Sequence, residues 1–74
     1  MTIEPNQIRA ARALLGWSGP ALAAAAGVSL STVRRLEEGG RSSPLARRAI
    51  DAALAAAGVR FTKDGVRLVA SAGA

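Results

Sequence analysis

Three polar residues in the segment 30–37 have the types and the spacing to bind an anionic group. Ser31, Arg34 and Arg35 stand at i, i+3 and i+4, so they share the outward face of a helix, and Leu30 lies beside them. A guanidinium bonds in a bidentate manner to phosphates and to the O6 and N7 atoms of guanine. This face therefore suits recognition of a nucleic acid. The alternative is that the arginines are only the solvated face of an amphipathic helix.

The other residue types give no support to catalysis. The chain has no cysteine and no histidine, which removes thiolate chemistry, most zinc sites and the usual general base. Its serines at 18, 29 and 43 are explained as helix N-caps. The carboxylates are scattered over different elements: Glu4, Glu37, Glu38, Asp51 and Asp64. We therefore expect no enzyme activity, no bound metal and no cofactor.

The 74 residues carry ten basic and five acidic side chains, a net charge of +5 that favours an anionic partner such as nucleic acid or an acidic membrane surface. We find no apolar run long enough to span a membrane and no signal peptide. A single small cytoplasmic domain is therefore expected. Only Trp17 and Phe61 are aromatic. A core this lean favours a dimer, since association would bury further apolar surface.

Capping residues divide the chain into helices at about 5–15, 19–26, 30–37 and 44–57. In the first helix Ile8, Ala11, Arg12 and Leu15 share a face, which Leu14 widens. Arg12 is thus expected at the edge of the apolar stripe. The buried side of the fourth helix is expected to consist of Leu45, Ile50, Ala53, Leu54 and Ala57.

The segment 59–69 changes to the alternating period of a β-hairpin. Asp64-Gly65 is the expected turn, which would pair Phe61 with Leu68 and Thr62 with Arg67. The apolar face would then comprise Val59, Phe61, Val66 and Leu68. We expect this face, or strand pairing, to form a dimer; the alternative is that the hairpin only packs on the fourth helix. Residues 70–74 are expected to be a flexible tail.

The stretch 19–38 meets the requirements of a helix-turn-helix. Gly27 stands at the turn between two short helices. Ala23 is the small residue where the second of these helices crosses the first. Val33 and Leu36 supply the inward-facing apolar positions of the second helix.

The segments IRAARALLGWS, LAAAAGVSLSTVRRLEEG and SPLARRAI resemble the phage-repressor-like (Cro/XRE-type) helix-turn-helix family, over about residues 5–58. Small bacterial members are also similar in their AGV-x-F and GVRL strands. The resemblance implies a mainly α fold, a compact four-to-five-helix bundle of the lambda-repressor-like DNA-binding type, with a C-terminal two-stranded β-hairpin. It also implies sequence-specific binding of double-stranded DNA, usually as a dimer, and a role in transcription, most simply as a repressor.

Within this resemblance each residue has an expected role. The base-reading residues are Leu30, Ser31, Arg34 and Arg35, and the DNA-backbone residues are Ser18, Gly19, Ser29, Thr32 and Arg41. The resemblance also supplies Glu37 as the partner of Arg12. Some positions depart from the family, which usually has glutamine or a similar polar residue at Gly19 and often a polar base-reading residue at Leu30. The usual polar or acidic capping residues of the second helix are also replaced, by Pro20, Ala21 and Ala24. Leu30 could instead pack on a thymine methyl group.

Two other functions remain open. The chain could be an antitoxin that binds DNA and also neutralises a toxin protein. It could also be an adaptor that kept the fold, binds only proteins and has lost its DNA site.

Overall fold

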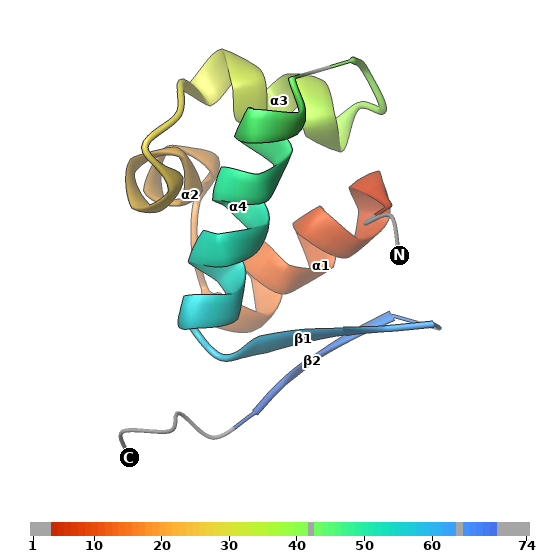
Figure 1. Cartoon of the computed structure of the whole chain (residues 1–74). Coiled ribbons are helices and arrows are strands. Elements are labelled where there is room, and N and C mark those ends of the chain that lie inside the picture. Colours follow the sequence, from red (N-terminus) through yellow and green to blue (C-terminus); the bar gives the residue numbers. More distant parts are fainter. Residues whose placement is uncertain (1–3, 42, 64, 70–74) are drawn as a thin grey trace.

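The computed structural model describes residues 4–41, 43–63 and 65–69, which form four helices and one two-stranded antiparallel hairpin (Figure 1). The elements are α1 (Pro5–Leu15), α2 (Gly19–Ala26), α3 (Leu30–Glu37), α4 (Pro44–Ala56), β1 (Val59–Thr62) and β2 (Gly65–Leu68). The expected fold, a helical bundle with a C-terminal hairpin, is confirmed. The expected tail at 70–74 lies outside the described residues.

Serine side chains begin three of the helices. The Oγ atoms of Ser18, Ser29 and Ser43 each accept a hydrogen bond from a backbone N–H three residues later, at 3.1 Å. Such a cap satisfies a donor that the first turn of a helix leaves unpaired. Because these signals are local, the bounds of α2 and α3 coincide with the expected ones. The bounds of α1, which begins at Pro5 after Glu4, coincide as well. The last helix ends at Ala56, one residue earlier than expected.

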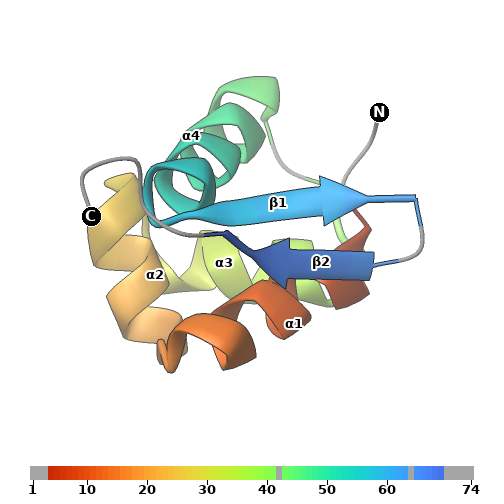
Figure 2. The ribbon, with the colours of Figure 1, turned by 90° about the horizontal axis from the view of Figure 1, so that it is seen from below.

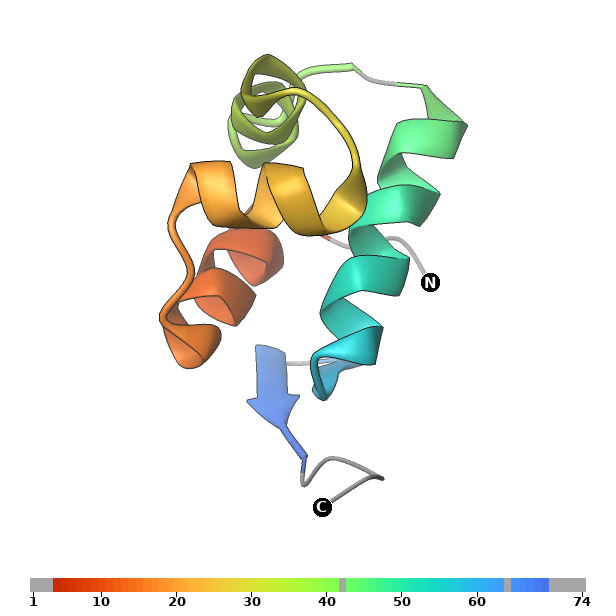
Figure 3. The ribbon, with the colours of Figure 1, turned by 90° about the vertical axis from the view of Figure 1, so that its left-hand side faces the viewer.

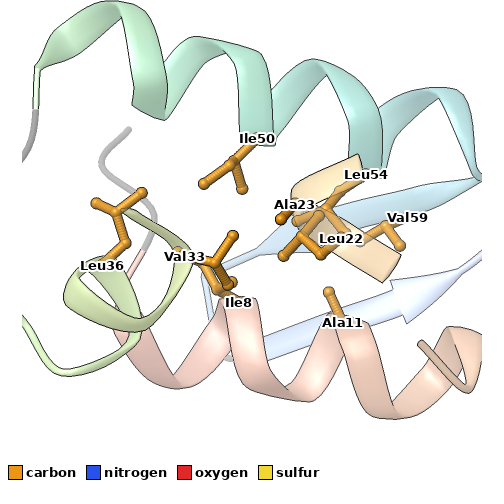
Figure 4. Packing of buried hydrophobic residues seen from close by; sticks show 9 residues of the cluster. All are labelled: Ile8, Ala11, Leu22, Ala23, Val33, Leu36, Ile50, Leu54 and Val59. Atoms are coloured by element: carbon orange, nitrogen blue, oxygen red, sulfur yellow. The ribbon is translucent and has the colours of Figure 1, made fainter. Parts of the chain in front are cut away.

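The core lies between the helices and is closed from one side by the hairpin (Figure 4). Val59 of β1 lies beside Leu22 and Leu54, so the hairpin is part of the same core as the helices. The buried hydrophobic residues are Ile8, Ala11, Leu22, Ala23, Val33, Leu36, Ile50, Leu54 and Val59.

Two leucines expected on buried faces lie at the surface, which corrects the prediction for each. Leu14 is 46% exposed and Leu45 is 77% exposed. Leu45 lies in the first turn of α4, whereas the buried residues of this helix begin at Ile50. Helical periodicity gives the direction of a side chain, but it does not show whether a neighbouring element covers that turn.

The hairpin pairs in a different register from the expected one. Its Cα partners are Val59↔Leu68, Arg60↔Arg67, Phe61↔Val66 and Thr62↔Gly65. The predicted pairs of Phe61 with Leu68 and of Thr62 with Arg67 are therefore wrong, and Gly65 belongs to β2 rather than to the turn. Asp64, the other expected turn residue, lies outside the described residues. A slide of two residues leaves every side chain on its face, because side chains alternate with a period of two.

Hydrogen bonds at both ends of the hairpin favour the observed register. At the open end the Val69 N–H donates to the Gly58 carbonyl at 2.7 Å. Gly58 has φ +98°, and a Cβ there would stand 2.9 Å from the Val69 oxygen, so this approach requires glycine. At the turn end Gln7 Nε2 donates to the carbonyls of Thr62 and Gly65, both at 3.0 Å. Gln7 therefore joins the start of α1 to the hairpin.

Candidate nucleic-acid interface

The helices α2 and α3 form a unit that turns at Gly27 (Figure 3). Gly27 has φ +70°, a left-handed conformation that glycine adopts readily. Ala23 in α2 is 6% exposed, and Val33 and Leu36 in α3 are 1% and 4% exposed. The expected inward residues of the helix-turn-helix are therefore in the core, and they determine which face of α3 remains outside.

The outer face of α3 carries the expected base-reading side chains. Ser31, Arg34 and Arg35 are all exposed, on the side opposite Val33 and Leu36. The stem of Arg35 lies over Gly40, since a Cβ on Gly40 would stand 2.6 Å from Arg35 Cγ. This contact directs the stem of Arg35 while its guanidinium stays accessible. Exposed arginines in this arrangement can bond to phosphates and to guanine edges.

Leu30 differs from the other three expected base readers because it is only partly exposed. A Cβ added to Gly19 would stand 3.1 Å from Leu30 Cδ1. These two departures from the family therefore lie next to each other. A side chain at position 19 would press on Leu30, which would have to shift by a few tenths of an ångström.

The expected backbone-contacting residues lie at these helix starts, except for Arg41, which is exposed in the loop after α3. Ser18 and Ser29 are exposed N-caps. Pro20 has no N–H and the N–H of Ala21 is capped by Ser18, so the start of α2 presents only the N–H of Gly19, whereas α3 presents those of Leu30 and Ser31. The Thr32 hydroxyl lies 2.9 Å from Ser29 Oγ and is engaged in a hydrogen bond within the protein. Helix N-termini of this kind bind anions such as phosphate.

Arg12 and Glu37 hold α3 against α1. Arg12 Nε and Nη2 donate to the two carboxylate oxygens of Glu37, at 2.6 and 2.8 Å, and Nη1 donates to the Trp17 carbonyl at 3.2 Å. Glu37 is 8% exposed, so its charge is buried and requires this partner. The hydrogen bond to Glu37 raises the pKa of Arg12, with a smaller opposing effect of burial.

Arg9 adds a contact that the sequence did not reveal. Its Nη2 donates to the carbonyl oxygen of Glu37 at 2.8 Å, at the end of α3. A cation at a helix C-terminus satisfies a free carbonyl and interacts well with the helix dipole. The helical periodicity of α1 directs Arg9 toward solvent, and only the position of α3 shows what it binds.

The four residues proposed for dimerisation have different environments. Val59 is 1% exposed and belongs to the core of its own chain, whereas Leu68 is 48% exposed. Phe61 and Val66 are partly buried and pack against that core. Of the four, Leu68 therefore offers the largest apolar surface for a partner.

The described residues also bear on metal binding and on membrane insertion. Within them, no three His, Cys, Asp or Glu residues are grouped where a metal ion could bind. No helix in the same residues has the length and apolar character to cross a membrane. The α2–α3 face offers guanidinium groups, a hydroxyl and helix N-termini.

Comparisons with known proteins agree with this geometry. A family model described as "Helix-turn-helix" matches residues 8–56, which include all of α2, α3 and α4 and most of α1. The search of curated proteins found no match. The matching family consists of DNA-binding regulators rather than enzymes. The chain therefore belongs to the Cro/XRE-type helix-turn-helix family.

Proposed function

We propose that this protein is a cytoplasmic transcriptional repressor that inserts α3 into the major groove of a specific DNA site. The observation that carries the proposal is the division of α3 into two sides. Val33, Leu36 and Glu37 anchor one side in the protein, whereas Ser31, Arg34 and Arg35 are exposed on the other. An anchored helix with exposed arginines presents its base-reading groups in one orientation.

Each group has a defined part in the proposed complex. Arg34 and Arg35 bond to guanine, and Ser31 bonds to a neighbouring base edge. Leu30, packed on Gly19, presents an apolar surface to a thymine methyl group. The N-termini of α2 and α3, with Thr32 and Arg41, position the protein on phosphates. The repressor would act by covering a promoter.

The protein is proposed to act as a homodimer formed through its hairpin. Among the described residues the two strands pair only with each other, so each has an open edge. The exposed part of Leu68 lies at this hairpin and would be covered in a dimer. Two copies of α3 would then read half-sites about 10 bp apart or a multiple of that distance. Analytical ultracentrifugation tests this interface. The wild-type protein should sediment as a dimer and the Leu68→Lys variant as a monomer with an unchanged circular dichroism spectrum. A variant that still sediments as a dimer would contradict the interface.

Fluorescence anisotropy tests the DNA contact, with a short labelled duplex selected by the wild-type protein. Replacing both Arg34 and Arg35 by alanine should weaken binding by about 1–3 kcal/mol for each arginine. The matched control replaces both by lysine, which keeps the charge but loses the bidentate geometry. This control should retain phosphate-driven affinity and its salt dependence, yet lose the preference for guanine. Unchanged binding by the alanine variant would contradict the proposed role of α3.

A further inference from the structure

The outer face of the hairpin carries positive charges that the α2–α3 interface does not use. Arg60 and Arg67, here called the hairpin basic face, are both exposed, and Lys63 is exposed in the turn that follows β1. Arg60 and Arg67 stand directly opposite each other in the strand register. Throughout the described part of the chain, no salt bridge joins any of the three to an acidic residue. Asp64, which follows Lys63, lies outside the described residues.

The strand register places the side chains of Arg60 and Arg67 next to each other on the outer face of the hairpin. Val59 is in the core, and side chains alternate along a strand, so Arg60 must point away from the protein. Arg67 follows because it is the cross-strand partner of Arg60. Like charges directly opposite each other destabilise a strand pair. An anion placed between the two guanidinium groups would relieve this repulsion and bond to both.

The hairpin and α3 lie at opposite ends of the molecule (Figure 1). The other helices separate them, and the view from below looks onto the hairpin with the helices behind it (Figure 2). A straight duplex in contact with α3 therefore does not reach Arg60 or Arg67. An anion bound at the hairpin must belong to a different molecule or to a different segment of DNA.

We propose that the hairpin basic face binds the sugar-phosphate backbone of a second DNA duplex, so that the protein bridges two DNA segments. Thr62 adds an exposed hydroxyl to the two arginines of this face, and Lys63 adds a cation at the neighbouring turn. All of these groups suit phosphate contacts. Protein interfaces depend on buried aromatic or aliphatic anchors, which the outer residues of the strands do not supply. A protein held on DNA by α3 also meets neighbouring duplexes at high effective concentration. The bridging of two duplexes rests on the DNA binding proposed for α3. The contact between the hairpin and DNA phosphates does not depend on it.

A capture experiment on the full chain tests this proposal. Beads carry one unlabelled duplex, and the protein must retain a second, fluorescent duplex on them. The combined change Arg60→Gln and Arg67→Gln should reduce capture about tenfold or more, because two phosphate contacts are lost. The matched control, Arg60→Lys with Arg67→Lys, should retain capture, since phosphate contacts tolerate lysine as a point charge. Binding of one short duplex, measured by anisotropy, should be the same in both variants and the wild type.

Several outcomes overturn the proposal. Capture that is unchanged in the glutamine variant would exclude a phosphate contact at the hairpin and favour an acidic protein as the occupant of this face. Loss of capture together with dissociation of a dimer in ultracentrifugation would show that bridging came from two copies of α3. Failure of the wild-type protein to bind even one short duplex would instead contradict the function proposed for α3. Anisotropy and capture therefore separate the two proposals.

Discussion

Gly19 lies against the side chain of Leu30, so closely that a Cβ at position 19 would stand 3.1 Å from Leu30 Cδ1. This contact joins the first residue of α2 to the first residue of α3. The family usually has a polar side chain at position 19 and often another at position 30. In this chain the leucine side chain at position 30 packs against the glycine at position 19. The two departures are therefore one steric arrangement rather than two independent losses.

A double-mutant cycle tests this arrangement. Gly19→Ala should stabilise the protein by about 0.4–1 kcal/mol by lowering the entropy of the unfolded chain, but in the wild-type background the added methyl group presses on Leu30. In a Leu30→Ala background the obstruction is absent, so Gly19→Ala should stabilise the protein by at least about 0.5 kcal/mol more. Chemical denaturation of the four proteins measures the coupling. Additive effects would show that the two residues do not constrain each other.

Arg12→Ala should destabilise the protein by about 2–4 kcal/mol, because it leaves the Glu37 carboxylate buried without its bidentate partner. Thermal unfolding should show a midpoint lower by about 4–8 °C for each kcal/mol. The bases preferred by the protein should not change, since Arg12 lies behind α3. An unchanged midpoint would show that the Arg12–Glu37 pair contributes nothing to stability.

The raised pKa of Arg12 also determines how this contribution depends on pH. A cation whose pKa is higher in the folded state stabilises the protein fully below its unfolded pKa, which for arginine lies far above neutral pH. That stability is lost only as the pH rises through the higher folded value. The stability difference between wild type and Arg12→Ala should therefore stay constant from about pH 7 to pH 10. Denaturation curves at several pH values that showed this difference shrinking would contradict the assignment.

Placing a negative charge at position 7 should lower the stability of the protein more than removing the Gln7 side chain. Gln7→Glu keeps the oxygen that accepts the Glu4 N–H, but it turns the Nε2 donor into an oxygen facing two carbonyls. Gln7→Ala removes both interactions without placing a charge there. We expect the glutamate variant to be the less stable of the two at neutral pH, by about 1 kcal/mol or more. Hydrogen exchange of the hairpin amides should increase in both variants, and equal protection in the wild type and both variants would exclude the role assigned to Gln7.

Arg60→Thr should slightly stabilise the protein, because it removes one of two like charges that stand opposite each other. The gain should be about 0.3 kcal/mol and should shrink in ~1 M salt, which screens exposed charges. Thermal unfolding at low and high salt measures it. A loss of stability at low salt would mean that the two arginines do not repel each other in the folded protein.

Local signals in the sequence were enough to predict the helices. Ser18, Ser29 and Ser43 act within one turn of themselves, so their caps need no tertiary information. The prediction of the Arg12–Glu37 pair came from two sources. The spacing of α1 places Arg12 at the edge of the buried stripe, and the resemblance supplies Glu37 as its partner.

Features that depend on neighbouring elements could not be predicted in this way. The predicted hairpin register was wrong because the alternation of side chains fits two registers that differ by two residues. Phe61 lies on the same face in both of them. Gln7 Nε2 and the guanidinium of Arg9 donate to backbone carbonyls that lie 28 or more positions away in sequence. No local pattern marks either contact. The prediction that Leu45 is buried was wrong for a similar reason, since its exposure depends on what covers the first turn of α4.

Selection of bound sites from random duplexes tests the central claim, that the outer face of α3 reads DNA sequence. The wild-type protein should enrich one motif with guanine at the positions that Arg34 and Arg35 contact. The variant with lysine at both positions should still bind DNA, but it should lose the preference for guanine at those positions. Enrichment of the same motif by both proteins, or of no motif by the wild-type protein, would contradict the claim.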